Sequence, residues 1–145
     1  MTPKQSIKHM TAVSLACERR GVMRDYAGWS IGKRRNLRVC RLIAERIAPQ
    51  YMFPLLFKDG DRDVTAVELI DELEHVLLGI SPARAYLMAS KICEERESVR
   101  HEIAGKIAYI LTRKFTVSRV DRSTQMTRRS SGGSGKWWET GQMAP

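Results

Sequence analysis

The chain has 145 residues, of which 43% are hydrophobic and 28% are charged, and its formal net charge is +9. This length and composition are typical of an ordinary globular domain and exclude a wholly disordered chain. No apolar run approaches the roughly 18 residues that a membrane-spanning helix needs, and residues 1–20 lack the long apolar centre of a secretory signal. We therefore expect a cytoplasmic protein with no membrane partner.

Charge is unevenly divided along the chain. Residues 1–58 carry a net charge of +9, residues 59–102 carry −6, and residues 103–145 carry +6. Such a chain offers cationic surfaces at both ends, and its acidic middle can dock on one of them or on a partner.

Two helices are predicted in the first third of the chain. Thr2-Pro3-Lys4-Gln5 is a capping box with proline at the first helical position, and it opens a helix that Gly21 can end. The expected inner side of this helix is Ile7, Met10, Val13, Ser14 and Cys17. Ser30 is a plausible cap for a second helix, which Pro49 should stop. The apolar stripe of that second helix is Leu37, Cys40, Ile43, Ala44 and Ile47.

The middle of the chain predicts a buried connection over residues 51–57 and a turn over residues 59–63. The turn resembles a calcium loop only in its alternate aspartates, because Val64 and Ile70 occupy the positions that need glycine and glutamate. Thr65-Ala66-Val67-Glu68 is a capping box for a third helix, which Gly79 ends. Its expected inner stripe is Ala66, Leu69, Ile70, Leu73, Val76 and Leu77.

Two further helices and a short strand complete the predicted domain. Ser81 and Pro82 start a fourth helix, whose expected inward residues are Ala85, Met88, Ala89, Ile92 and Cys93. The spacing of Val99, Ile103, Ile107 and Ile110 predicts a fifth. Beyond Leu111 apolar residues recur at about every second position, which is typical of a short strand or of the frayed end of a helix. The predicted fold class is therefore all-α: a mainly helical single domain over residues 1–120, with four to five helices and a short C-terminal strand or wing. Residues 121–145 are too polar to build a core and predict a flexible basic tail.

Residues 66–93 match a helix-turn-helix in part. Gly79 between Leu78 and Ile80 fits the turn of that motif. The outward residues of its second helix, which would read base edges, are Ser81, Arg84, Tyr86 and Lys91. The first helix has an acidic outer face, and Glu94, Glu95 and Glu97 follow the second helix. These carboxylates oppose contact with a phosphate backbone, so a plain corner between core helices is the alternative.

The strongest electrostatic feature is the basic row, which we define as Lys33, Arg34, Arg35, Arg38 and Arg41. Arg34, Arg38 and Arg41 are spaced i, i+4, i+7 and would share one side of a helix. Cations near a helix N-terminus are disfavoured by the macrodipole, and an anionic partner would offset that cost. We expect this row to hold nucleic-acid phosphates; the alternatives are solvation or pairing with the acidic residues 68–72.

The tail adds a second set of expected nucleic-acid contacts. Arg128 and Arg129 extend the cationic surface, and Trp137 with Trp138 can stack on exposed bases. The same tryptophans would also serve as an anchor for a protein partner.

The sequence indicates no active site, cofactor or metal. Cys17, Cys40 and Cys93 form no C-x-x-C pair, so neither a disulfide framework nor a zinc site is predicted. His101-Glu102 lacks the second histidine of a zinc-protease helix, and Gly132 to Lys136 lacks the spacing of a phosphate loop.

The functional hypothesis is non-enzymatic DNA binding, as a transcription regulator or an accessory factor in DNA transfer, packaging or replication. A homodimer is expected if the target is palindromic. One alternative is a protein-interaction or assembly factor that docks through the acidic helix 66–78, with Glu68, Asp71 and Glu72 at the contact. The other is RNA binding through the same basic row.

Overall fold

The computed structural model describes residues 1–29 and 35–120. Within these ranges the chain is mainly helical, with six helices and a small three-stranded antiparallel sheet. The helices are α1 (Pro3–Cys17), α2 (Arg20–Ala27), α3 (Arg38–Met52), α4 (Ala66–Gly79), α5 (Pro82–Leu87) and α6 (Cys93–Lys114). The strands are β1 (Leu55–Asp59), β2 (Arg62–Asp63) and β3 (Thr116–Arg119). The predicted tail, Ser30, Lys33 and Arg34 lie outside the described residues.

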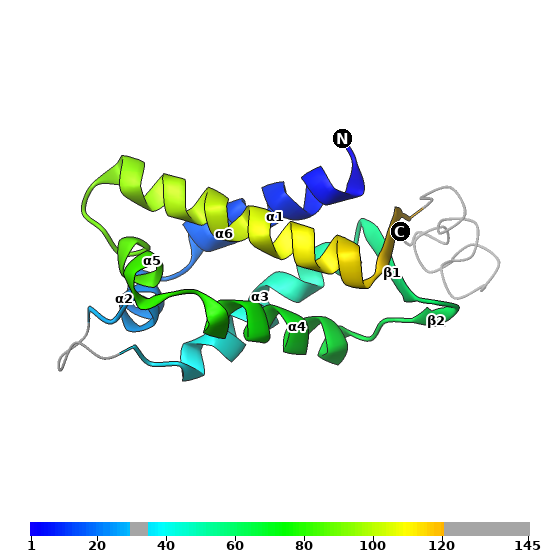
Figure 1. Ribbon diagram of the computed structural model, residues 1–145, viewed down its shortest axis with the longest axis horizontal. Helices are drawn as coiled ribbons and strands as arrows, with labels where there is room; N and C mark the ends of the chain where they lie inside the picture. The colour runs from blue at the N-terminus through cyan, green and yellow to red at the C-terminus, as the bar shows by residue number, and fades with distance from the viewer. Residues whose placement is uncertain (30–34, 121–145) are drawn as a thin grey trace, which may run out of the picture.

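Two helix pairs form the body of the molecule, α1 with α6 and α3 with α4 (Figure 1). The pair α1 and α6 is antiparallel, since Lys4 lies over the ring of Tyr109 and the Lys8 side chain approaches Gly105. The short helices α2 and α5 pack together at one end, and the sheet closes the other end. The core between the pairs contains Ile7, Leu15, Ile43, Ile47, Tyr51, Leu69, Leu73, Leu77, Ile103, Ile107 and Leu111.

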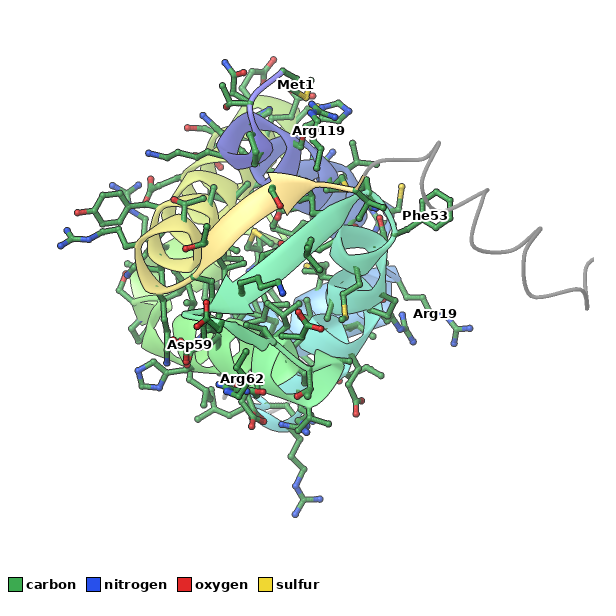
Figure 2. All side chains as sticks on the ribbon, turned by 90° about the vertical axis from the view of Figure 1, so that its right-hand side faces the viewer. Met1, Arg19, Phe53, Asp59, Arg62 and Arg119 are labelled. Atoms are coloured by element: carbon green, nitrogen blue, oxygen red, sulfur yellow. The ribbon has the colours of Figure 1, made fainter. Side chains whose placement is uncertain are left out.

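The sheet has the order β2-β1-β3, with both pairings antiparallel. Gly60 turns the β1–β2 hairpin with φ of 65°, a left-handed conformation that favours glycine. Figure 2 views the molecule from the sheet end, where Asp59 and Arg62 flank this hairpin and Met1 lies beside Arg119. The predicted turn and C-terminal strand are confirmed. The expected buried connection over residues 51–57 is instead the end of α3 and the start of β1, in which Leu55 and Phe57 are buried and Leu56 between them is exposed.

The predicted helix starts are confirmed where a side chain caps them. Thr2 and Thr65 each complete a capping box, with Gln5 and Glu68 as the reciprocal partners. Ser81 accepts a hydrogen bond from the backbone N–H of Arg84 and starts α5. The inner faces of α3 and α4 are also largely as predicted, because their apolar stripes are unambiguous.

Several helix boundaries differ from the predictions. The second predicted helix, expected to follow a cap at Ser30, begins only at Arg38, and residues 35–37 are not helical, so Arg35 precedes the helix and, of the described members of the expected arginine row, only Arg38 and Arg41 lie on α3. The first helix ends at Cys17 rather than Gly21, because Glu18 is drawn inward to an ion pair with Arg46 and α2 begins afresh. The helix α3 continues through Pro49 to Met52, since its last turn holds the buried Tyr51. The fourth helix stops at Leu87, and α6 begins at Cys93.

Several residues predicted to face inward are exposed as a result: Val13, Cys17, Leu37, Ala66, Ile92 and Cys93. In α1 the buried face instead runs through Ile7, Thr11 and Leu15. The Thr11 hydroxyl bonds to the carbonyl of Ile7 and to the hydroxyl of Tyr51, so a polar residue occupies the core. An apolar periodicity could not reveal that face.

None of the helices within the described ranges is long and apolar enough to cross a bilayer. The same ranges contain no group of three His, Cys, Asp or Glu side chains placed to hold a metal ion.

The start of α4 should make stability sensitive to acid. Arg62 donates to both carboxylate oxygens of Glu68 at 2.6 and 2.8 Å, and with the Thr65 backbone N–H it lowers the pKa of Glu68 to about 2. Because that pKa is lower in the folded than in the unfolded chain, the carboxylate stabilises the fold above about pH 4.5 and loses this effect as pH falls toward 2. We expect Glu68→Gln to reduce the drop in Tm between pH 5 and pH 2, measured by circular dichroism. Glu97→Gln is the matched control and should leave the drop unchanged, because Glu97 has no ion pair among the described residues.

Candidate anion-binding pocket

Of the described members of the basic row, Arg35 and Arg41 contact other groups of this chain and Arg38 is exposed to solvent. Arg35 is half-buried, and its guanidinium donates to the carbonyls of Tyr26 at 3.0 Å, Ile80 at 3.0 Å and Leu77 at 3.4 Å. Its carbon Cζ also lies 4.8 Å from the centre of the Tyr26 ring. Arg35 therefore satisfies the C-terminal carbonyls of α4, a structural role that differs from the predicted phosphate contact.

Arg41 is also used within the molecule. Its guanidinium lies 2.5 Å from the carboxylate of Asp71 and 3.3 Å from that of Glu74, because α3 packs alongside α4. These carboxylates raise the pKa of Arg41. Of the basic row, Arg38 alone among its described members keeps an exposed side chain with no ion pair.

The acidic face of α4 is likewise paired internally. Glu68 binds Arg62, Asp71 binds Arg41, and Glu72 binds Lys114. These are the three residues that the assembly hypothesis needs for a protein partner. Exposed ion pairs stabilise a fold by only about 0–1 kcal/mol each, but each of these three carboxylates already lies against a cation of this chain.

The four candidate base-reading residues lie on different sides of α5 and do not share one surface. Ser81 and Arg84 lie on one side, where the Arg84 guanidinium is 3.3 Å from the carboxylate of Glu102. Tyr86 stacks on Trp29 at 4.9 Å between ring centres, and Lys91 follows in the connection to α6. The helix α5 has only six residues and packs against α2 and α6, so the arrangement is closer to the predicted corner than to a long reading helix.

A cavity of about 430 Å³ lies among the end of α1, α2, the α5–α6 connection and the start of α6. Five cationic side chains line it: Arg20, Arg24, Lys91, Arg96 and Arg100. We call this the cationic pocket. Its volume falls within the roughly 300–1,000 Å³ that is typical of ligand sites.

The only carboxylate on the wall of this pocket, within the described ranges, is Glu18. Its side chain is 4% exposed and is bound to Arg46 and to the backbone N–H of Arg19. The negative charge of Glu18 is therefore already compensated outside the ring of five cations. An anion in the pocket would meet a net positive field.

Four of the five cations of the pocket have no partner among the described residues. The side chains of Arg20, Arg24, Lys91 and Arg100 form no hydrogen bond or ion pair within residues 1–29 and 35–120. Arg96 donates one bond to the carbonyl of Ser90 at 2.6 Å. Cations that line one cavity repel one another, and a bound anion would offset this repulsion, so the pocket is a candidate anion-binding site.

The start of α6 explains how two of these arginines reach the pocket. The buried stripe of this helix includes Ile103, Ile107 and Leu111, and Arg96 and Arg100 continue the same stripe toward its N-terminus at spacings of four and three. Both arginines are only half-exposed. The helix thus directs cations, rather than apolar side chains, into the space between α1, α2 and α5.

The end of α2 places an aromatic wall beside these cations. Gly28 adopts φ of 84°, which returns the chain so that the backbone N–H groups of Gly28 and Trp29 both bond to the carbonyl of Arg24. The indole N–H of Trp29 donates to the carbonyl of Tyr86 at 2.9 Å. Trp29 is held at the pocket by these two contacts.

Lys91 and Tyr86, which the sequence predicts as site residues, lie at the pocket and next to it. Arg20, Arg24, Arg96 and Arg100 were not predicted. The available signal was the register of Arg96 and Arg100 with the apolar residues of α6. Lys33, Arg34, Arg128, Arg129, Trp137 and Trp138 lie outside the described residues.

No protein-family model matches this chain, and comparisons with curated proteins and with solved structures find no significant match. Its function is therefore inferred from its own residues.

Proposed function

We propose that this protein binds DNA, without catalysing a reaction on it. The convergence of five cations on one pocket, four of them unpaired within the described residues, supports this proposal. A phosphate backbone supplies the missing negative charge at closely spaced positions, and arginine binds phosphate oxygens with two parallel hydrogen bonds.

The proposed phosphate contacts are Arg20, Arg24, Lys91, Arg96 and Arg100. Arg38 adds an exposed cation from the basic row. Lys33, Arg34 and the tail residues Arg128 and Arg129 remain proposed contacts of the same kind. Arg35 and Arg41 leave the set because their guanidinium groups bind carbonyls and carboxylates of this chain.

Within this proposal the biological role is that of a transcription regulator or an accessory factor in DNA transfer, packaging or replication. Tyr86 is the proposed reader of base edges, since its side chain is 51% exposed next to the pocket. The assembly alternative has less support, because the acidic residues of α4 are paired within the molecule.

Salt dependence tests the proposal directly. Each phosphate contact contributes about −0.9 to the slope of log affinity against log salt, so five contacts predict a slope of about −4.5. Between about 50 and 200 mM salt the affinity for a labelled DNA duplex should therefore fall roughly 500-fold, as measured by fluorescence anisotropy. The same titration with RNA of equal length identifies the polymer.

Absence of binding to any nucleic acid at the lower salt concentration would contradict the proposal. A slope near zero would contradict it as well, because binding would then not depend on the cations. Tighter binding to RNA than to DNA would replace DNA by RNA as the partner.

A further inference from the structure

The walls of the cationic pocket combine two kinds of chemistry. One part carries the guanidinium groups, of which Arg96 and Arg100 are half-buried rather than spread on the surface. The other part is apolar and aromatic, and consists of Leu15, Ala16, Met23, Trp29, Met88 and Ala89. A phosphate alone would use only the first part.

The aromatic wall has one face already occupied. Tyr86 stacks against Trp29 at an interplanar angle of 30°, yet Tyr86 is not part of the pocket lining. Trp29 does line the pocket, so part of its surface borders the cavity. A second flat ring can pack there, as bases pack on aromatic side chains in single-strand-binding proteins.

The partial burial of two arginines favours a ligand that enters the cavity. Phosphates of an intact duplex can approach the exposed Arg20, Arg24 and Lys91. Arg96 and Arg100 are half-buried, so a group that enters the cavity contacts them more fully than a backbone that stays outside it. A nucleotide whose base is not paired has both the freedom to enter and the two chemistries that the walls match.

We infer that the cationic pocket takes one unpaired nucleotide of a DNA strand, with its base against Trp29 and its phosphate on Arg96 and Arg100. The inference rests on the proposed DNA binding, because it names the part of the polymer that occupies the pocket. A free mononucleotide shares this chemistry, and the experiment separates the two sources.

The experiment uses the full chain with Trp137→Phe and Trp138→Phe, because the sequence has three tryptophans and these changes leave Trp29 as the sole indole. Four probes are titrated: a blunt duplex, the same duplex with a single-stranded overhang, adenosine monophosphate and inorganic phosphate. We expect the overhang to quench Trp29 emission and to bind about tenfold or more tightly than the blunt duplex, in line with the stacking of a base. Quenching by the mononucleotide, but not by phosphate, would add the free nucleotide as a ligand.

Two variants assign the effect to the pocket. Arg100→Gln should abolish the preference for the overhang, while Arg113→Gln, the same change at the other end of α6, should preserve it. Trp29→Leu should also abolish the preference, which is measured for this variant by the fluorescence anisotropy of labelled DNA because no indole remains, and thermal unfolding of each variant checks that it is folded.

The outcomes distinguish this inference from the proposed function. Equal binding of blunt and overhang DNA, with no change in Trp29 emission, would overturn the inference and leave DNA binding intact. Binding to neither DNA would overturn the proposed function. In that case quenching by the mononucleotide would retain the nucleotide site, and its absence would overturn both.

Discussion

Replacement of Arg35 by methionine is expected to lower the free energy of unfolding by about 3 kcal/mol. The substitution removes three hydrogen bonds to backbone carbonyls, two of them at the end of α4. Hydrogen bonds from a charged donor contribute about 1.5–3 kcal/mol each, and the abandoned carbonyls of a half-buried helix end recover only part of this from water. Urea denaturation followed by circular dichroism measures the loss.

Arg38→Met is the matched control, because Arg38 lies three positions further on and its exposed side chain has no ion pair in the described ranges. It should change the free energy of unfolding by less than about 0.5 kcal/mol. Arg35→Lys should recover less than half of the lost stability, since an ammonium group lacks the planar fork of donors. If Arg35→Met unfolds like the wild type but loses DNA affinity, the side chain faces phosphate and the capping role is wrong.

Reversal of two pocket charges, Arg24→Glu with Arg100→Glu, is expected to reduce DNA affinity at least roughly 100-fold. Two charge-assisted contacts of about 1.5–3 kcal/mol each are lost, and two negative charges now face the phosphates. The slope of log affinity against log salt should become shallower by about 1.8, because two fewer counterions are released. Fluorescence anisotropy with a labelled duplex measures both quantities.

The control variant changes the net charge by the same amount but at positions outside the cationic pocket. Lys106→Glu with Arg113→Glu alters two exposed cations of α6 that do not line the pocket. It should reduce affinity less than tenfold, through the long-range field alone. Equal losses in the two double variants would show that net charge, not the pocket, determines binding.

Local signals predicted the side-chain-capped starts of α1, α4 and α5 and two of the buried faces. A threonine cap and its reciprocal glutamine or glutamate act within one turn, so Thr2 and Thr65 could be identified without knowing the fold. The stripes of α3 and α4 repeat over several turns and leave little choice of face. These predictions depend only on neighbours in sequence.

Features set by distant contacts could not be predicted. Pro49 is a helix breaker by local rules, but α3 passes it because Tyr51 is buried and its hydroxyl meets that of Thr11. The phosphate-binding role of the basic row was predicted from the spacing of its residues. The packing of α3 on α4 instead brings Arg41 to Asp71, and that contact could not be predicted from spacing.

The pocket was missed for a related reason. Its cations come from α2, the α5–α6 connection and α6, which are adjacent only in the fold. The carboxylates of Glu94, Glu95 and Glu97 made the start of α6 look acidic, although Arg96 and Arg100 occupy the inward positions among them. Net charge over a segment conceals which face each charge occupies.

The pairing of α1 with α6 also constrains how the chain can fold during its synthesis. Ile7 on the first helix is buried beside a helix that includes Ile107, 100 positions later in the sequence. At about 5–20 residues per second, the ribosome needs roughly 5–20 s to deliver the partner of an apolar surface that has already emerged. The apolar face of α1 therefore stays without its partner until α6 has been synthesised.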